Sequence, residues 1–392
     1  MLRRTLLHRI GLGALAPAPV LAQPGPGRTL VVGPSGSGSS GSSLAQALRE
    51  ARDGDTIEVL SGDYRGDVAV IGQRRLTIRG VGARPVLHAD GRAAERKAIL
   101  VVRDGDITIE NLEFRGARVA DLNGAGIRFE RGRLRVRRCA FFDNENGILT
   151  ANFGDAEIDI EDSEFADAPP QPGQLNHLIY VGTIGRARIV GSRFERGHIG
   201  SLIKSRAARN EIAFNLIADG ASGRASYEID LPNGGLALVQ GNAIAQGPLA
   251  ENSTLVAYGA EGRPWPRSEL SMSHNTLLNG RAQGGFFLRV WPERLTADAR
   301  VDLLNNLSLG PGQWLAGPTA RVRGQAGAGA DALRDPARGD FMLRPGALIN
   351  GPALDPRDID GRDLAPRAEF MLPVGTRALA PPPQWVAGAF QR

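Results

Sequence analysis

The sequence predicts an all-β protein, a single right-handed parallel β-helix solenoid with an N-terminal capping helix and irregular C-terminal turns. Three observations predict this fold. A short apolar motif recurs along the chain, a turn signal follows most of its copies, and the composition is rich in Gly (51) and Pro (25) but poor in aromatic residues (5%). Units that repeat at this spacing stack into a solenoid, with one coil for each copy.

The recurring motif has the form apolar-x-x-slot-x-apolar. Its slot is occupied, in successive copies, by Leu112, Cys139, Ser163, Ser192, Asn215, Asn242, Asn275 and Asn306. A second short apolar strand precedes most copies, as in LIYV, LIKS and YEIDL. We expect the slot side chains to form one buried ladder in which the asparagines hydrogen-bond to each other, so that the cysteine is an inert buried thiol. The phenylalanine two positions after the early slots should stack in the same way.

The chain divides into three predicted parts. Residues 1–22 have the basic start, short apolar stretch and small-residue cleavage site of an export signal, and the pair Arg3 and Arg4 favours twin-arginine export. Residues 23–312 form the β-helix, which opens with a capped helix over LAQALREA that covers the strand edges at its end. Residues 313–392, rich in Gly, Pro and Ala, are predicted to pack back on the coils as a C-terminal extension.

Charge, cysteine content and hydropathy exclude several classes of protein. Removal of the predicted signal takes away three arginines and no acids, so the remaining charges almost balance and argue against a nucleic-acid partner. One cysteine leaves no disulfide framework, and no apolar run after the signal is long enough to span a membrane. No spacing of His, Cys and Asp indicates a zinc site. We expect a monomer in the periplasm or outside the cell.

Lysine is rare in this chain, because among 47 Lys plus Arg residues only Lys97 and Lys204 are lysines. Side chains alternate between the two faces of a strand, so Lys204 points outward if the neighbouring isoleucine points inward. The same alternation puts Tyr180 and Asp230 outward in the adjacent coils, with Arg206 on the same face. Such a row is a polar groove of the kind that holds an extended, charged sugar chain. A lysine flanked by other cations can lose its proton, whereas arginine stays charged.

Five further residues are predicted to line this groove as substrate-binding groups: Glu228, His177, His198, Arg128 and Arg289. The glutamate comes two residues before Asp230, the histidines begin two of the coils, and the arginines continue the column in both directions. For the histidines, hydrogen bonding within a turn is the alternative. For Lys204, the alternative is a solvated strand residue that pairs with Asp230 or Glu228.

These patterns resemble the pectate-lyase-like superfamily of right-handed parallel β-helices, which includes pectate lyases, polygalacturonases, alginate epimerases and chondroitinase-B-like lyases. The resemblance covers residues 28–392 and rests on DGDTIEVLSGDYRG, ITIENLEFRGA, the I-x-x-N-x-I-x-x-G copies and the ending DFMLRPGALING…VAGAF. The motif layout is nearest to chondroitinase-B-like lyases, in which a Lys-Ser on a strand supplies the base. Lys204 and Ser205 match that pair, whereas YEIDLP stands where those lyases have the Arg-His-Gly that supplies the acid.

The resemblance implies an exported lyase or epimerase that acts on an acidic, uronate-containing polysaccharide. Lyase cleavage needs a group that neutralises the carboxylate, a base for the C5 proton and an acid for the leaving oxygen. We assign the base to Lys204 and the other two tasks to Arg206 and Tyr180. No cofactor is expected from the residues themselves, but some of these lyases use calcium, which Glu228 and Asp230 could meet.

Other functions stay open beside the lyase. A non-catalytic polysaccharide-binding β-helix would carry aromatic residues that stack on sugars, and Tyr180, Tyr227 and Tyr258 keep that alternative open. A structural or adhesive solenoid is disfavoured, because the charged residues of interest cluster in the middle coils. A polygalacturonase-like hydrolase ranks below a lyase, because the cluster of aspartates that hydrolysis needs is missing.

Overall fold

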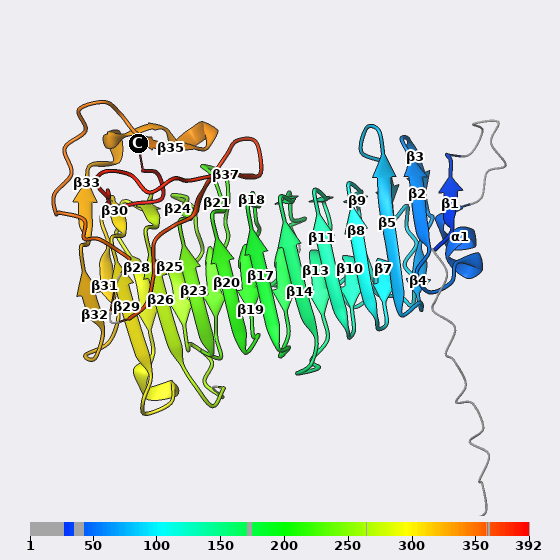
Figure 1. The fold of residues 1–392 in the computed structure, drawn as a ribbon, viewed down its shortest axis with the longest axis horizontal. Helices are drawn as coiled ribbons and strands as arrows, with labels where there is room; N and C mark the ends of the chain where they lie inside the picture. Colours follow the sequence, from blue (N-terminus) through cyan, green and yellow to red (C-terminus); the bar gives the residue numbers. More distant parts are fainter. Residues whose placement is uncertain are drawn as a thin grey trace, which may run out of the picture.

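The structure, a computed structural model, describes residues 27–34, 43–170, 175–263, 265–357, 359 and 361–391. They form one right-handed parallel β-solenoid of about ten coils, which confirms the predicted fold class. Figure 1 shows the coils side by side along the long axis, with the N-terminal coils in blue at one end. Each complete coil gives one strand to each of three parallel sheets, and the incomplete coils at the two ends add the remaining strands. The predicted export signal over residues 1–22 lies outside the described residues.

The strands of each sheet follow one another coil by coil. The first sheet has twelve strands: β1 (Thr29–Val32), β2 (Thr56–Leu60), β5 (Arg75–Val81), β8 (Asp106–Glu110), β11 (Arg133–Arg137), β14 (Glu157–Glu161), β17 (Arg186–Val190), β20 (Arg209–Ala213), β23 (Leu236–Gln240), β26 (Glu269–Ser273), β29 (Arg300–Leu304) and β32 (Arg321–Arg323). The second sheet has ten strands: β4 (Ala69–Ile71), β7 (Ala98–Val102), β10 (Ala125–Phe129), β13 (Asn146–Thr150), β16 (Ile179–Val181), β19 (Ile203–Ser205), β22 (Ile229–Leu231), β25 (Thr254–Tyr258), β28 (Phe286–Val290) and β31 (Gln313–Leu315). The third sheet has eleven strands: β3 (Asp63–Arg65), β6 (Val86–His88), β9 (Glu113–Arg115), β12 (Ala140–Phe142), β15 (Glu164–Ala166), β18 (Arg193–Glu195), β21 (Leu216–Ala218), β24 (Ala243–Gln246), β27 (Thr276–Asn279), β30 (Leu307–Leu309) and β33 (Ala326–Ala328).

The apolar core fills the inside of the solenoid. Alternate residues of the first-sheet strands point inward, as Ile107 and Ile109 do in β8, and both are fully buried. The inward side chains of the three sheets merge into one apolar cluster that runs from Val32 to Ala316. Cys139 lies in this core, and burial raises the pKa of its thiol to about 12, as expected of an inert thiol.

The slot residues form the predicted buried ladder, in which each coil bonds to the next. The Asn215 N–H donates to Asn242 Oδ1 at 3.0 Å, and the Asn242 N–H donates to Asn275 Oδ1 at 3.1 Å. Asn242 Nδ2 also donates to the carbonyl oxygen of Ile212 at 2.8 Å. The predicted aromatic stack has ring centroids 4.6 to 4.9 Å apart and consists of Phe114, Phe141, Phe165 and Phe194. These contacts fix the register between coils.

A short helix covers the N-terminal end of the solenoid, as predicted. Helix α1 (Leu44–Glu50) is capped by the preceding Ser43, whose hydroxyl accepts a hydrogen bond from the Gln46 N–H. Leu44 and Leu48 are buried at this end of the core. Among the described residues, no helix is long and apolar enough to cross a membrane.

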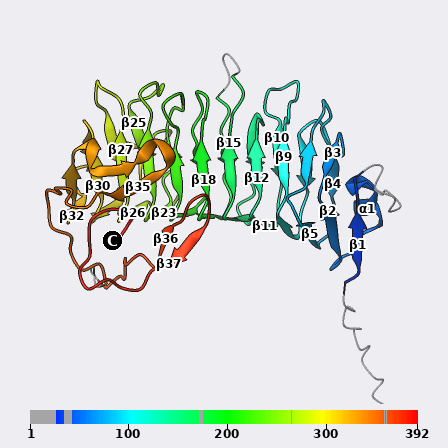
Figure 2. The ribbon, with the colours of Figure 1, turned by 90° about the horizontal axis from the view of Figure 1, so that it is seen from above.

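The chain after the last coil packs back along the solenoid. The three sheets continue through β31, β32 and β33 to Ala328, so they extend beyond the boundary predicted at residue 312. The remaining segment holds the hairpins β34 (Leu333–Asp335) with β35 (Asp340–Leu343) and β36 (Ala368–Phe370) with β37 (Thr376–Ala378). Short 3-10 turns are η1 (Pro292–Arg294), η2 (Ala330–Ala332) and η3 (Pro336–Arg338). Figure 2 shows this segment lying against the middle and last coils, and the Gly375 N–H donates to the carbonyl of Gly191 at 2.8 Å.

Candidate functional site

A row of polar side chains crosses the middle of the second sheet. Tyr180 of β16 pairs in register with Lys204 of β19, and Lys204 pairs with Asp230 of β22. The strand neighbours Ile179 and Ile203 are fully buried in the core, so alternation along each strand turns the polar three toward the outer face. The predicted side-by-side arrangement of these three residues is confirmed.

The line of outward residues continues across the sheet on both sides of Tyr180, Lys204 and Asp230. On each side, one apolar residue separates these three from an arginine. On the N-terminal side, Leu149 is in register with both Arg128 of β10 and Tyr180. On the other side, one alanine separates Asp230 from Arg289 of β28. Two strand spacings, about 10 Å of backbone, therefore separate each arginine from the polar row. Both arginines lie on the predicted column.

Two carboxylates hold Lys204. Its Nζ lies 3.0 Å from Asp230 Oδ2 and 2.6 Å from Glu261 Oε1, and 5.9 Å from the centroid of the Tyr180 ring. The lysine side chain is only 11% exposed. The pairing with Asp230 that the alternative expected is present, but the lysine is an enclosed group and not a solvated one.

Arg206 ties the remaining groups together. Its Nε donates to the Tyr180 hydroxyl oxygen at 3.0 Å, and its Nη1 donates to Asn233 Oδ1 at 2.7 Å. Its Nη2 donates to Glu261 Oε2 at 2.5 Å. Glu261 thus presents one oxygen to Lys204 and the other to Arg206. We call Tyr180, Lys204, Arg206, Asp230 and Glu261 the lysine cluster.

The segment that follows β25, residues 259–263, brings Glu261 to the row. The preceding coil holds this segment in place. The Glu261 N–H donates to the carbonyl of Pro232 at 3.1 Å, and Asn233 Nδ2 donates to the carbonyl of Gly262 at 2.7 Å. Trp265 Nε1 also donates to the carbonyl of Arg206 at 2.9 Å. The sequence pattern missed Glu261, and the only signal for it was the wide spacing of 33 residues between two successive slots.

The pKa of Lys204 is raised, whereas the sequence analysis expected neighbouring cations to lower it. Burial lowers the pKa of this amine, but the charge of Asp230 and the hydrogen bonds to Glu261 and Asp230 outweigh burial and raise it. The expectation of a lysine whose pKa is lowered by neighbouring cations was wrong, because the carboxylates of Asp230 and Glu261 both lie against the amine. For Asp230, burial is the largest cause and raises the pKa, and its Oδ1 is buried without a partner among the described residues. For Glu261, burial is opposed by the two cations, and the pKa falls.

His177 borders the lysine cluster, as predicted. Its Nδ1 accepts a hydrogen bond from the Ser201 N–H at 2.8 Å, and its ring meets that of Tyr180 edge-on at 5.1 Å. Burial, and then the charge of Lys204, lower the pKa of this imidazole to about 3. His177 is therefore neutral, and its Nε2 carries the proton.

Two predicted groove residues do not join the lysine cluster. Glu228 is fully buried beside Gln246, whose Nε2 lies 3.4 Å from Glu228 Oε2, and burial with the nearby charge of Asp219 raises the pKa of Glu228 well above its usual value. It was placed outward by strand alternation, but it lies in a bend just before β22 and is buried there. His198 forms a backbone bridge with Arg224, and no contact among the described residues joins it to the cluster.

The tyrosines of the binding alternative have different surroundings. Tyr258 is fully buried and its hydroxyl donates to the carbonyl of Gly235 at 2.6 Å, so it offers no face to a sugar. Tyr227 is partly buried near the row. Burial, followed by the charge of Asp230, raises its pKa. Of the three, Tyr180 and Tyr227 remain within reach of the groove.

The residues present do not fit a calcium ion. Calcium takes six to eight oxygen ligands, including several carboxylates. Glu228 lies inside the protein, and Asp230 is buried with its Oδ2 3.0 Å from the ammonium of Lys204. The part of the chain that the structure describes has no group of three or more His, Cys, Asp or Glu side chains that could hold a metal ion.

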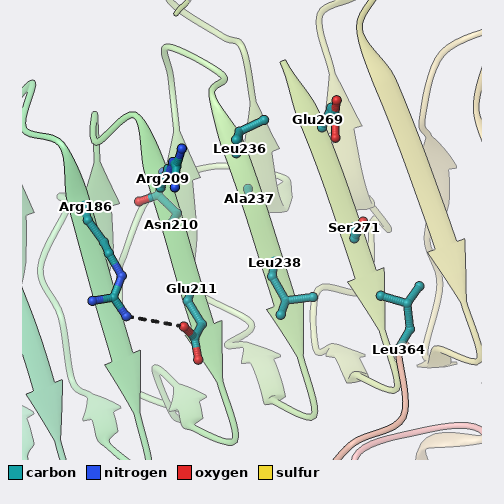
Figure 3. A pocket seen from close by; sticks show the side chains of 10 residues that line it. All are labelled: Arg186, Arg209, Asn210, Glu211, Leu236, Ala237, Leu238, Glu269, Ser271 and Leu364. Carbon is teal, nitrogen blue, oxygen red and sulfur yellow. Dashed lines mark ion pairs between the residues drawn. The ribbon is translucent and has the colours of Figure 1, made fainter. Parts of the chain in front are cut away.

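A separate hollow lies on the outer face of the first sheet. Figure 3 shows its lining, in which Arg209 and Glu211 stand beside Leu236 and Leu238. Its volume is about 380 Å³, and none of the predicted site residues lines it. Glu211 is held there by two arginines, with Arg188 Nε at 3.3 Å.

Comparisons with known proteins agree with the fold. No protein-family model matches the chain, and a search of curated proteins finds no match either. Among solved structures, pectate lyase Pel9A superimposes with a TM-score of 0.60 at 14% sequence identity, covering 94% of this chain and 97% of the other. ORF18 of Geobacillus virus E2 gives a TM-score of 0.44 at 12% identity, and the match spans 71% of this chain and 53% of that one. The likeness to the pectate lyase shows that this chain has the same β-helix fold.

Proposed function

We propose that this chain is an exported, carbohydrate-active lyase or epimerase that binds a uronate-containing polysaccharide across the lysine cluster. One observation carries the proposal: Lys204 and Arg206 together hold a single carboxylate, that of Glu261. Glu261 comes from a loop, and its side chain is 44% exposed against 11% for Lys204. A uronate carboxylate has the same charge and shape, so it can take the place of Glu261 on the two cations.

Each member of the cluster then has a task. Arg206 keeps its charge at every relevant pH and donates to the incoming carboxylate from Nη2, which now holds Glu261, and this makes the C5 proton more acidic. The uronate carboxylate that replaces Glu261 carries the same charge, so the amine of Lys204 still faces two carboxylates and its pKa stays raised; Lys204 acts as the base in its unprotonated fraction, which grows as the pH rises. The Tyr180 hydroxyl, oriented by Arg206 at 3.0 Å, is the acid.

The reaction balances with these groups alone. The unprotonated Nζ of Lys204 takes the C5 proton, the freed electron pair forms the C4=C5 double bond, and the C4–O bond breaks. Tyr180 gives its proton to the departing oxygen. In epimerisation no bond breaks at C4, and a proton returns to C5 from the opposite face. Because Lys204 must first lose a proton, turnover is expected to rise as the pH rises.

The test is incubation of the purified protein with a panel of uronate polymers, followed by the absorbance of the unsaturated product. A rise in absorbance on at least one polymer supports the lyase, and exchange of the C5 hydrogen with solvent without cleavage supports the epimerase. If the protein binds a polymer but catalyses neither reaction, its function would be that of a non-catalytic binding protein. Failure to bind any acidic polymer would refute the proposed function.

A further inference from the structure

A second cavity lies beside the lysine cluster on the same face of the second sheet. Its volume is about 340 Å³, and it extends from Arg128 to Tyr180 over Leu149. That size falls in the range of small-molecule sites, about 300–1,000 Å³. Tyr180 belongs to both the cavity and the lysine cluster, because it lines the cavity and its hydroxyl accepts a hydrogen bond from Arg206. The cavity is therefore continuous with the proposed reaction site.

The lining of this cavity has the chemistry of a sugar site. Leu149 is an apolar floor between Arg128 and Tyr180, suited to the C–H face of a pyranose ring. Amide side chains surround it, and amides can donate to and accept from hydroxyl groups. They are Asn123, Asn146, Asn152 and Asn176. This combination differs from the first-sheet hollow of Figure 3, where leucines and charged side chains predominate.

Arg128 supplies selectivity for an acidic sugar. Its Nε already holds a carboxylate, Glu130 Oε1, at 3.1 Å, and its side chain is 21% exposed. The same carboxylate oxygen lies 2.8 Å from Nζ of Lys97, the second of the two lysines. Glu130 therefore keeps a partner if Arg128 turns toward a ligand. The pattern of lysine, arginine and shared glutamate repeats that of the lysine cluster.

We propose that this cavity is a distal subsite that binds a uronate residue of the same polysaccharide chain, with its carboxylate on Arg128. The proposal rests on the proposed function. Arg128 and Lys204 are three strand spacings apart in register, roughly 14 Å of backbone, so one extended oligosaccharide reaches both. Long oligomers engage both places, whereas a short one that occupies the lysine cluster does not reach Arg128.

The experiment measures binding calorimetrically with a dimer and a hexamer of galacturonate, and in parallel with the same lengths of mannuronate. The native protein should bind the hexamer more tightly than the dimer. Arg128→Ala should lose roughly tenfold in hexamer affinity and leave dimer affinity unchanged, because only the long ligand reaches that hydrogen-bonded charge. Arg128→Gln, which keeps the packing of the side-chain stem, should show the same selective loss. Arg209→Ala, in the first-sheet hollow, is the matched control and should change neither affinity.

Two results would overturn the subsite while leaving the proposed function intact. One is native-like hexamer affinity in both Arg128 variants. The other is an equal loss for dimer and hexamer, which would assign Arg128 to the fold or to the reaction site. If the native protein bound no uronate oligomer of either length, the subsite and the proposed function would both fall.

Discussion

Replacement of Glu261 by glutamine removes the charge that occupies both cations of the lysine cluster. In the native protein, a substrate carboxylate must displace Glu261 from Lys204 at 2.6 Å and from Arg206 at 2.5 Å. Glu261 is 44% exposed, so each ion pair is treated as a surface pair worth about 0.2–1 kcal/mol. The two together amount to about 0.5–2 kcal/mol. Without that competition, affinity for a uronate oligomer should increase by roughly twofold to thirtyfold.

The assay is calorimetric titration of native protein and Glu261→Gln with a uronate oligomer, together with thermal unfolding of both. Glu211→Gln is the matched control, because Glu211 is also held by two arginines and its side chain is 38% exposed, but on the first sheet. The control should lose a similar, small amount of stability and leave oligomer affinity unchanged. Weaker binding by Glu261→Gln would refute the reasoning, because it would make Glu261 a contact for the ligand instead of its competitor.

Two further predictions concern the buried groups. Asn242→Ala should lower the free energy of unfolding by about 2–4 kcal/mol, because it leaves the Asn215 N–H and the Ile212 carbonyl without their partner, and an unchanged denaturant midpoint would contradict the ladder. Glu228 has a pKa raised by burial and by Asp219, so its neutral form is favoured in the fold and native stability falls as pH rises through that pKa. Glu228→Gln should therefore have a higher melting temperature than the native protein at alkaline pH and a smaller difference at acid pH. A difference in melting temperature that does not change with pH would disprove it.

The features that depend on neighbouring coils could be predicted from the repeat. Asn242 bonds to rungs one coil away, and Tyr180, Lys204 and Asp230 meet because strand alternation and parallel register bring equivalent positions together. Both properties are set by the spacing of similar residues along the chain, which one sequence displays. The outward row and its flanking arginines could be predicted for the same reason.

The features that depend on loops could not be predicted in this way. Glu261 reaches Lys204 from 57 residues along the chain through a loop with no periodic pattern, and it adds to Asp230 in raising the pKa of Lys204. Glu228 was assigned to the groove by extending strand alternation past the start of β22. At that point the chain bends just before the strand, and Glu228 lies buried beside Gln246 and near the charge of Asp219.

The most direct test of the proposed site compares native protein, Lys204→Arg and Lys97→Arg on whichever uronate polymer the native protein cleaves. Lys97→Arg is the matched control, since it changes the other lysine of the chain. Initial rates are followed by the absorbance of the unsaturated product. Lys204→Arg should keep its fold and most of its affinity but lose roughly 10²–10⁴ in turnover, because a guanidinium does not readily take a proton, while Lys97→Arg stays close to native. Native-like turnover in Lys204→Arg would contradict the assignment of Lys204 as the base.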